Sequence, residues 1–229
     1  MRDTTFAKSA YSEIRADLDT FDLLLWSGNS RLSKFIQYGT GSQWSHVGMV
    51  IKMPGDLLML WESTIHDATT DTPPVDGVQL TPLSKSITGH MAVRRMECQR
   101  TPEMYDRLWE VRKELDGRPF EASWTEFLLA GYDGPFGSQT RDLTTLFCAE
   151  LIAETLQRVG LLDGSKPSNE FTPRDFSSES TTPLGLLSGA KLHDEIIVNK
   201  DEARIRAQAE KSVQLNARGL ANPMLCCFA

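Results

Sequence analysis

Hydrophobic and polar residues alternate along the chain in segments typical of a mixed α and β protein. An apolar run at 21–26 predicts a buried strand, and two apolar runs on either side of Pro54-Gly55 predict a β-hairpin that begins at His46. Both runs are apolar at nearly every position, which indicates central strands covered on both faces. Further strands are expected at 77–83, 91–96 and 196–198.

Apolar residues at helical spacing predict helices at 6–19, around 32–36, at 103–115 and at 145–160. Asp142 or Thr144 can cap the last of these, which ends at Gly160. The remaining segments are a Gly- and Pro-containing loop at 131–141, a Ser/Thr/Pro-rich stretch at 163–183 and a polar, helix-prone tail at 200–229. We therefore expect one α+β domain over residues 1–199, followed by that tail.

Composition narrows the class of protein. The chain has 229 residues, of which 40% are hydrophobic and 24% charged, so we expect one packed domain with one active site. A net charge of -7 and the absence of a long basic cluster argue against a nucleic-acid partner. The first twenty residues lack the apolar run of a signal peptide, and no stretch is apolar enough to span a bilayer, so we expect a cytoplasmic protein.

The four cysteines are Cys98, Cys148, Cys226 and Cys227, and no two of them form a CxxC pair. Neither a zinc ribbon nor a disulfide framework is therefore indicated. Cys148 lies in the first turn of the helix predicted at 145–160, where unpaired backbone amides favour a thiolate over a thiol. The alternative interpretation, a small buried core residue, remains open at this point.

His46 opens the first strand of the hairpin and Glu62 lies near the end of the second, so both lie at the same end of the sheet. A cysteine, a histidine and a carboxylate together can generate a nucleophile, because the imidazole takes the thiol proton and the carboxylate orients the imidazole. A two-residue loop at 54–55 would place Glu62 on the face away from His46, whereas an odd-length loop or one bulge would place it opposite His46. Ser63 is the other candidate neighbour, and a structural histidine beside a solvated glutamate is the non-catalytic alternative.

Three segments in a fixed order resemble one family. They contain Asp22-Leu23, then Ser45-His46-Val47-Gly48, and far downstream Phe147-Cys148-Ala149-Glu150. With residues 171–176, they are similar to the circularly permuted NlpC-type, papain-like cysteine hydrolases of the YiiX-like branch. The resemblance covers about residues 20–180, and its motifs are specific as a set though weak singly.

The resemblance implies an α+β, permuted papain-like fold in which a small antiparallel sheet packs against the nucleophile helix. It implies Cys148 as nucleophile, His46 as base and Glu62 as the residue that orients the base. The expected reaction cleaves an amide, ester or thioester through an acyl-enzyme, with a small peptide or acyl-amino acid as substrate. A lipid acyltransferase or phospholipase-like enzyme, a deubiquitinase-like isopeptidase and a non-catalytic ligand-binding module are the alternatives.

We expect no cofactor. A zinc site formed by the same three residues is an alternative, and His66, His90 and His193 lack the spacing of metal ligands. The Cys148 backbone amide is the expected oxyanion donor, while Tyr38, Gln43 and Trp44 are candidates without an assigned role. Cys98 is expected to be a buried thiol.

The last four residues, Cys226-Cys227-Phe228-Ala229, fit the Cys-a-a-X pattern of prenylation. One isoprenoid on Cys226 would attach the protein only weakly to a membrane, because a single lipid chain binds reversibly and no polybasic patch assists it. The alternative is an unmodified terminus with two incidental thiols.

Overall fold

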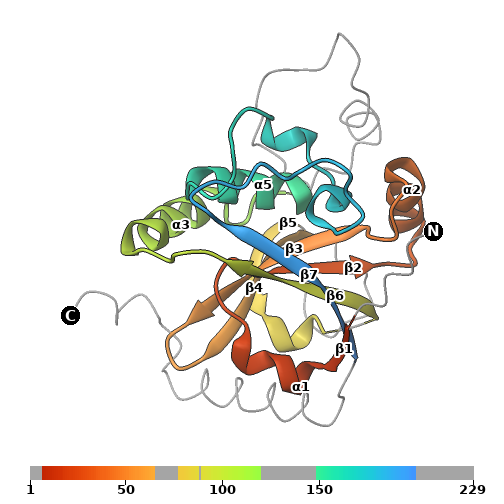
Figure 1. The fold of residues 1–229 in the computed structure, drawn as a ribbon, viewed down its shortest axis with the longest axis horizontal. Helices are drawn as coiled ribbons and strands as arrows, with labels where there is room; N and C mark the ends of the chain where they lie inside the picture. Colours follow the sequence, from red (N-terminus) through yellow and green to blue (C-terminus); the bar gives the residue numbers. More distant parts are fainter. Residues whose placement is uncertain (1–6, 65–76, 88, 120–147, 200–229) are drawn as a thin grey trace.

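The computed structural model describes residues 7–64, 77–87, 89–119 and 148–199. They form a mixed α+β fold around one seven-stranded sheet with the strand order β1-β7-β6-β2-β3-β4-β5 (Figure 1). The strands are β1 Ala7–Ala10, β2 Leu23–Ser27, β3 His46–Met53, β4 Leu57–Thr64, β5 Gly77–Pro82, β6 His90–Glu97 and β7 Lys191–Asn199. Every neighbouring pair is antiparallel except β1 and β7, which run parallel.

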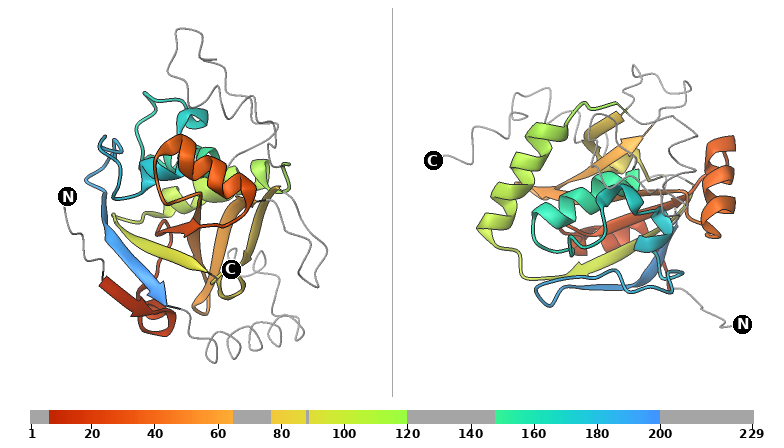
Figure 2. Two further views of the ribbon diagram at one scale, coloured as in Figure 1. Left: turned by 90° about the vertical axis from the view of Figure 1, so that its right-hand side faces the viewer. Right: turned by 90° about the horizontal axis from the view of Figure 1, so that it is seen from above.

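The helices are α1 Tyr11–Ile14, α2 Arg31–Thr40, α3 Pro102–Leu115 and α5 Cys148–Arg158, with 3-10 turns η1 Arg15–Asp17, η2 Leu83–Lys85, η3 Ser168–Glu170 and η4 Pro173–Phe176. Helices α3 and α5 lie over one face of the sheet, and α1 lies under the other (Figures 1 and 2). Ser30 caps α2 and Thr101 caps α3 by accepting a backbone N–H of the first turn.

Both faces of the central strands are buried. Side chains of consecutive strand residues point to opposite faces, and each face packs into its own hydrophobic core. Val47 and Met49 pack with α5 residues on one face. Leu24 and Val50 pack with Tyr11 on the other. The continuous apolar runs of the sequence therefore correspond to central strands, as predicted.

Most predicted elements are confirmed within a few residues: the hairpin, the strands at 77–83 and 91–96, and the helices around 32–36, at 103–115 and before Gly160. The lead-in helix at 6–19 is wrong in part. Ala7–Ala10 instead form β1, which pairs with the distant β7, and only two short helical turns follow. Apolar residues at helical spacing can still form a strand, and here Ala7–Ala10 pair with the outer side of β7.

The sheet is larger than expected and is not purely antiparallel. The strand predicted at 196–198 extends over nine residues of β7, and its polar half pairs with β6 across an irregularity near Arg94. Backbone pairing with β6 and β1 supports this strand, and such pairing leaves little trace in the sequence of the strand itself.

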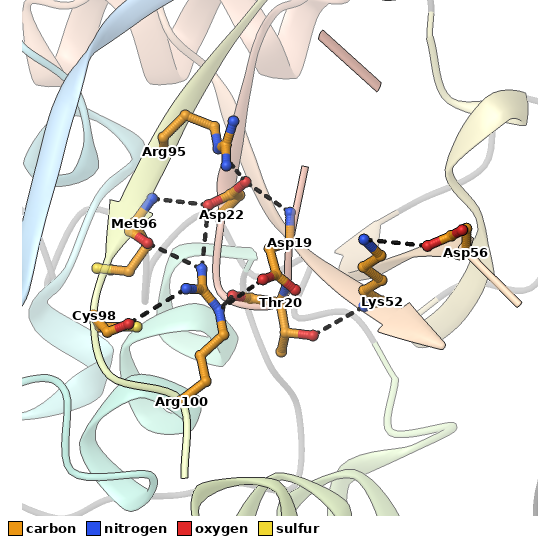
Figure 3. Close-up of polar contacts among 9 residues, drawn as sticks. All are labelled: Asp19, Thr20, Asp22, Lys52, Asp56, Arg95, Met96, Cys98 and Arg100. Carbon is orange, nitrogen blue, oxygen red and sulfur yellow. Dashed lines mark hydrogen bonds and ion pairs between the residues drawn. The ribbon is translucent and has the colours of Figure 1, made fainter. Parts of the chain in front are cut away.

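Asp22 ties the start of β2 to the end of β6 (Figure 3). Its buried carboxylate accepts the Met96 and Asp19 N–H groups and forms ion pairs with Arg95 at 2.7 Å and Arg100 at 3.7 Å. Burial raises the pKa of this carboxyl, and the amide donors and the two arginines oppose that rise. Lys52 and Asp56, in the same view, form a separate and more exposed pair.

Several predictions fall outside the described residues: the loop at 131–141, the cap at Asp142 or Thr144, His66, the tail at 200–229 and Cys226. Among the helices that are described, none combines the length and the hydropathy that crossing a bilayer requires.

Candidate active site

His46 is placed by the junction of β2 and β3. Ser45 fixes this junction: its N–H donates to the Trp26 carbonyl at 2.9 Å, and its Oγ accepts the Gly28 N–H at 2.9 Å. His46 follows as the first residue of β3 and pairs in register with Trp26 of β2. Its side chain is 20% exposed, so the imidazole lies at the surface end of a buried strand.

Glu62 contacts His46 from the next strand, with 2.8 Å between its Oε2 and the imidazole Nε2. The hairpin loop has three residues, since Met53 is the last partner of Leu57, so the odd-length alternative is confirmed. The register places Glu62 diagonal to His46 rather than directly opposite, and both side chains therefore share one face of the sheet. Glu62 is buried, with 7% of its surface exposed.

Cys148 is the first residue that the structure describes in α5, and it is buried. Its sulfur is hydrogen-bonded to the His46 side chain and to the backbone N–H groups of Val47 and Ala149. The pairing of β3 with β4 begins only at Met49 and Trp61, so the β4 ladder does not use the Val47 N–H. Separation of these two strands leaves that amide for the sulfur.

Helix α5 is anchored on the sheet one strand away from His46. The Trp61 indole N–H of β4 donates to Thr155 Oγ1 of α5 at 3.2 Å, and both side chains are completely buried. Every residue of α5 from Cys148 to Leu156 is buried, and its apolar side chains pack with the sheet and α3. The helix therefore has one fixed position, and Cys148 is held with it.

Mutual attraction between Cys148 and His46 changes the protonation of both groups. Burial alone disfavours both charges, but Cys148 and Glu62 raise the pKa of His46 from 6.5 to about 10. Burial likewise opposes a thiolate, yet His46 and the two backbone donors lower the pKa of Cys148 below 9.0. The arrangement favours a thiolate beside an imidazolium, which is the reactive form of a cysteine nucleophile.

Since Glu62 occupies Nε2 of the imidazole, Nδ1 is the nitrogen that remains for the Cys148 sulfur. The predicted site residues Cys148, His46 and Glu62 are therefore brought together. Ser63, the other candidate neighbour of His46, lies on the opposite face of β4 from Glu62 and is completely buried.

The three candidates of the segment before His46 have different surroundings. The Tyr38 side chain is 90% exposed, and Trp44 is completely buried with its indole N–H unpartnered in the part of the chain that the structure describes. Gln43 is held by Glu179, which accepts both its backbone N–H and its side-chain amide. This contact joins residues 136 positions apart, and the sequence contains no signal for it.

The other described histidines and Cys98 make no hydrogen bond or ion pair with the His46 side chain. His90 stacks on Trp44, His193 pairs with Glu97 at 3.1 Å, and Cys98 is partly buried with a raised pKa. Across the described ranges, no group of three or more His, Cys, Asp and Glu side chains has the arrangement of a metal site.

Comparison with known proteins finds a likeness among solved structures. No family model matches the sequence, and no curated protein matches it. The chain is similar to metalloprotein yiiX from Escherichia coli O157:H7. The two sequences are 21% identical, the match covers 78% of this chain and 88% of that one, and the TM-score is 0.43.

Proposed function

We propose that this protein is a cysteine-dependent hydrolase or acyltransferase of the permuted papain-like type, with Cys148 as nucleophile, His46 as acid and base, and Glu62 as the group that orients His46. One observation carries the proposal: a single imidazole hydrogen-bonded to a buried carboxylate on one side and to a buried thiol on the other. A structural histidine needs neither partner, whereas a catalytic cysteine needs a base in hydrogen-bond contact, and a carboxylate behind that base orients it.

In the proposed reaction the Cys148 thiolate attacks the carbonyl carbon of an amide, ester or thioester. The His46 imidazolium then donates its proton to the leaving group, and a thioester forms between the acyl group and Cys148. The neutral imidazole next takes a proton from water, or from another acceptor, as that molecule attacks the thioester. The Cys148 backbone amide is the proposed donor to the oxyanion.

The substrate class that we propose is a small peptide or acyl-amino acid.

The order of His46 before Cys148 in the chain, on a strand and a helix respectively, supports the permuted arrangement. Because Glu62 is buried, its negative charge acts on His46 and is little screened by solvent.

The test is trapping of the acyl-enzyme. The protein is incubated with an activated ester, an aminoacyl anilide and an acyl thioester, and the acyl group is located by peptide mass spectrometry. We expect an adduct on Cys148 with at least one of these compounds, and a loss of turnover of about a thousandfold or more in Cys148→Ala.

Cys98→Ala is the matched control, because it removes a thiol outside the site and should leave turnover unchanged. Equal turnover in wild type and Cys148→Ala would contradict the proposal. Slow, equal alkylation of Cys148 and Cys98 in the wild-type protein would instead indicate a ligand-binding module that does not use its thiol.

A further inference from the structure

Trp26 is the direct neighbour of His46 across the β2–β3 pair. The two residues are register partners, so their side chains stand side by side on the same face of the sheet. The ring centroids are 5.2 Å apart, and the planes are inclined by 50°. The imidazole therefore contacts an aromatic surface in addition to its two polar partners.

The indole of Trp26 is hydrogen-bonded at one end and lies beside Gly48 at the other. Its N–H donates to the Ser86 carbonyl, just after η2, at 3.1 Å. At the other end, Cζ3 reaches over Gly48 and lies 3.4 Å from where a Cβ would stand at that position. The same Cβ would lie 2.6 Å from Leu60 Cδ1, so the space beside Gly48 is filled by two neighbouring side chains.

We propose that Trp26 is a positioning residue for His46. The Trp26 indole, bonded to Ser86 and lying over Gly48, keeps the imidazole in one orientation. In that orientation the imidazole reaches both Glu62 and Cys148. This inference rests on the proposed function, because it gives His46 a single productive orientation. A tryptophan whose N–H is bonded to the backbone and whose ring fills the space beside a glycine has few rotamers of its own, so the ring packed against it also loses freedom.

The indole also favours the charged form of His46. An aromatic ring within about 6 Å of a cation attracts it through the negative face of the π system. The titratable groups that face His46 are Glu62 from β4 and Cys148 from α5, while β2 contributes the neutral Trp26. Removal of the indole should therefore weaken the ion pair between His46 and Cys148.

The test is the pH profile of Cys148 alkylation by iodoacetamide, followed by peptide mass spectrometry, which needs no substrate. For Trp26→Leu we expect a Cys148 alkylation rate at pH 6 about three- to tenfold below that of the wild type, because loss of a cation–π contact moves the thiolate profile to higher pH. For Trp26→Phe, which keeps a ring but loses the N–H bond to Ser86, we expect a smaller change of about twofold.

Trp109→Leu is the matched control, because Trp109 lies on α3 beside Arg112 and away from His46. It should leave the Cys148 profile unchanged, and the Cys98 rate serves as an internal reference in every variant. The His46 titration followed by NMR in Trp26→Phe gives a second measurement if Trp26→Leu does not fold.

Profiles of Cys148 and of His46 that match the wild type in folded Trp26 variants would overturn the inference. That outcome differs from failure of the proposed function. If the proposed function is wrong, Cys148 of the wild-type protein is no more reactive than Cys98 at pH 6, whatever residue occupies position 26.

Discussion

The imidazole of His46 has partners of opposite kinds, a carboxylate at Nε2 and a thiol that can become an anion. Burial acts to lower the pKa of His46, but both partners act to raise it, and together they raise it to about 10. The reactivity of the Cys148 thiol therefore depends on the charge of His46 beside it.

Replacement of His46 tests this dependence. His46→Ala removes the cation that lowers the pKa of Cys148 while the burial that raises it remains, so alkylation of Cys148 at pH 7 should slow by about tenfold or more. Glu62→Gln keeps a hydrogen-bond acceptor and loses only the charge, so its effect should be smaller. His193→Ala, which changes an exposed residue of β7, is the control and should leave the Cys148 alkylation rate unchanged. An unchanged rate in His46→Ala would show that His46 does not activate the thiol.

Asp22 allows a second prediction for a single residue. The groups around its carboxylate are donors: two backbone N–H groups and two arginines. Asp22→Asn replaces one acceptor oxygen with a donor, so we expect the free energy of unfolding to fall by about 2–4 kcal/mol. Asp56→Asn, in the exposed pair with Lys52, should cost less than about 0.5 kcal/mol. Urea unfolding measures both, and equal values would show that the Asp22 network does not stabilise the fold.

At the scale of elements, the three-residue loop of the β3–β4 hairpin decides which side chains share a face. Gly55 and Asp56 both adopt positive φ values, of 77° and 58°, which close the loop over three residues. Shortening the loop by one residue would move Glu62 to the other face of the sheet, away from His46. The site therefore depends on loop geometry at the far end of the hairpin.

Gly77 is a point where two elements approach too closely for any side chain. It opens β5 with φ 117°, and a Cβ there would lie 2.1 Å from the Arg118 carbonyl oxygen, which accepts the Val78 N–H. Because this neighbour is backbone, Gly77→Ala requires the chain after α3 to move, and we expect a loss of about 2–4 kcal/mol in the free energy of unfolding.

Gly55→Ala separates the cost of a positive φ from the cost of the close approach to Arg118. Gly55 also has a positive φ, but no atom lies near its missing Cβ, so only the backbone cost of about 1 kcal/mol is expected. If the two variants lose equal stability in thermal unfolding, the approach of Arg118 to Gly77 is not a constraint.

At the scale of the whole molecule, folding brings together two titrating groups that are 102 positions apart in the sequence. In the folded chain the pKa of His46 is raised to about 10, and the pKa of Cys148 is lowered from 9.0 by His46 and the two backbone donors. In the unfolded chain the two groups titrate near 6.5 and 9.0. Wherever between pH 6.5 and 9.0 the folded chain holds the thiolate beside the imidazolium, both states carry one proton on the pair, so there the pair's contribution to stability should not vary with pH.

Outside that range the contribution should fall in both directions. Above pH 9.0 only the folded chain keeps a proton, on His46, so stability is lost as pH rises toward 10, at up to about 1.4 kcal/mol per pH unit. Below pH 6.5 the unfolded chain binds both protons, so stability is lost as pH falls through the lowered pKa of Cys148. Urea unfolding of the wild type against the double variant His46→Ala, Cys148→Ala measures this, and a constant difference from pH 5 to 10 would exclude the ion pair.

Local patterns in the sequence were sufficient to predict the strand that begins with His46, the hairpin that contains Glu62, and the helix that contains Cys148. These predictions depend on residues within one element, where the periods of 2 and 3.6 are directly visible. Neither the pairing of β1 with β7 nor the neighbour of His46 on β2 follows from such patterns, because both depend on contacts between distant segments.

Tertiary structure alone decided the register that places Glu62 beside His46, the separation of β3 from β4 that leaves the Val47 N–H for Cys148, and the packing of Trp26 on the imidazole. The physical reason is that side-chain direction in a strand reverses with every residue, so one residue of loop length determines whether two groups meet. The sequence determined which chemical groups are available, and the pairing of the strands determined which of them make contact.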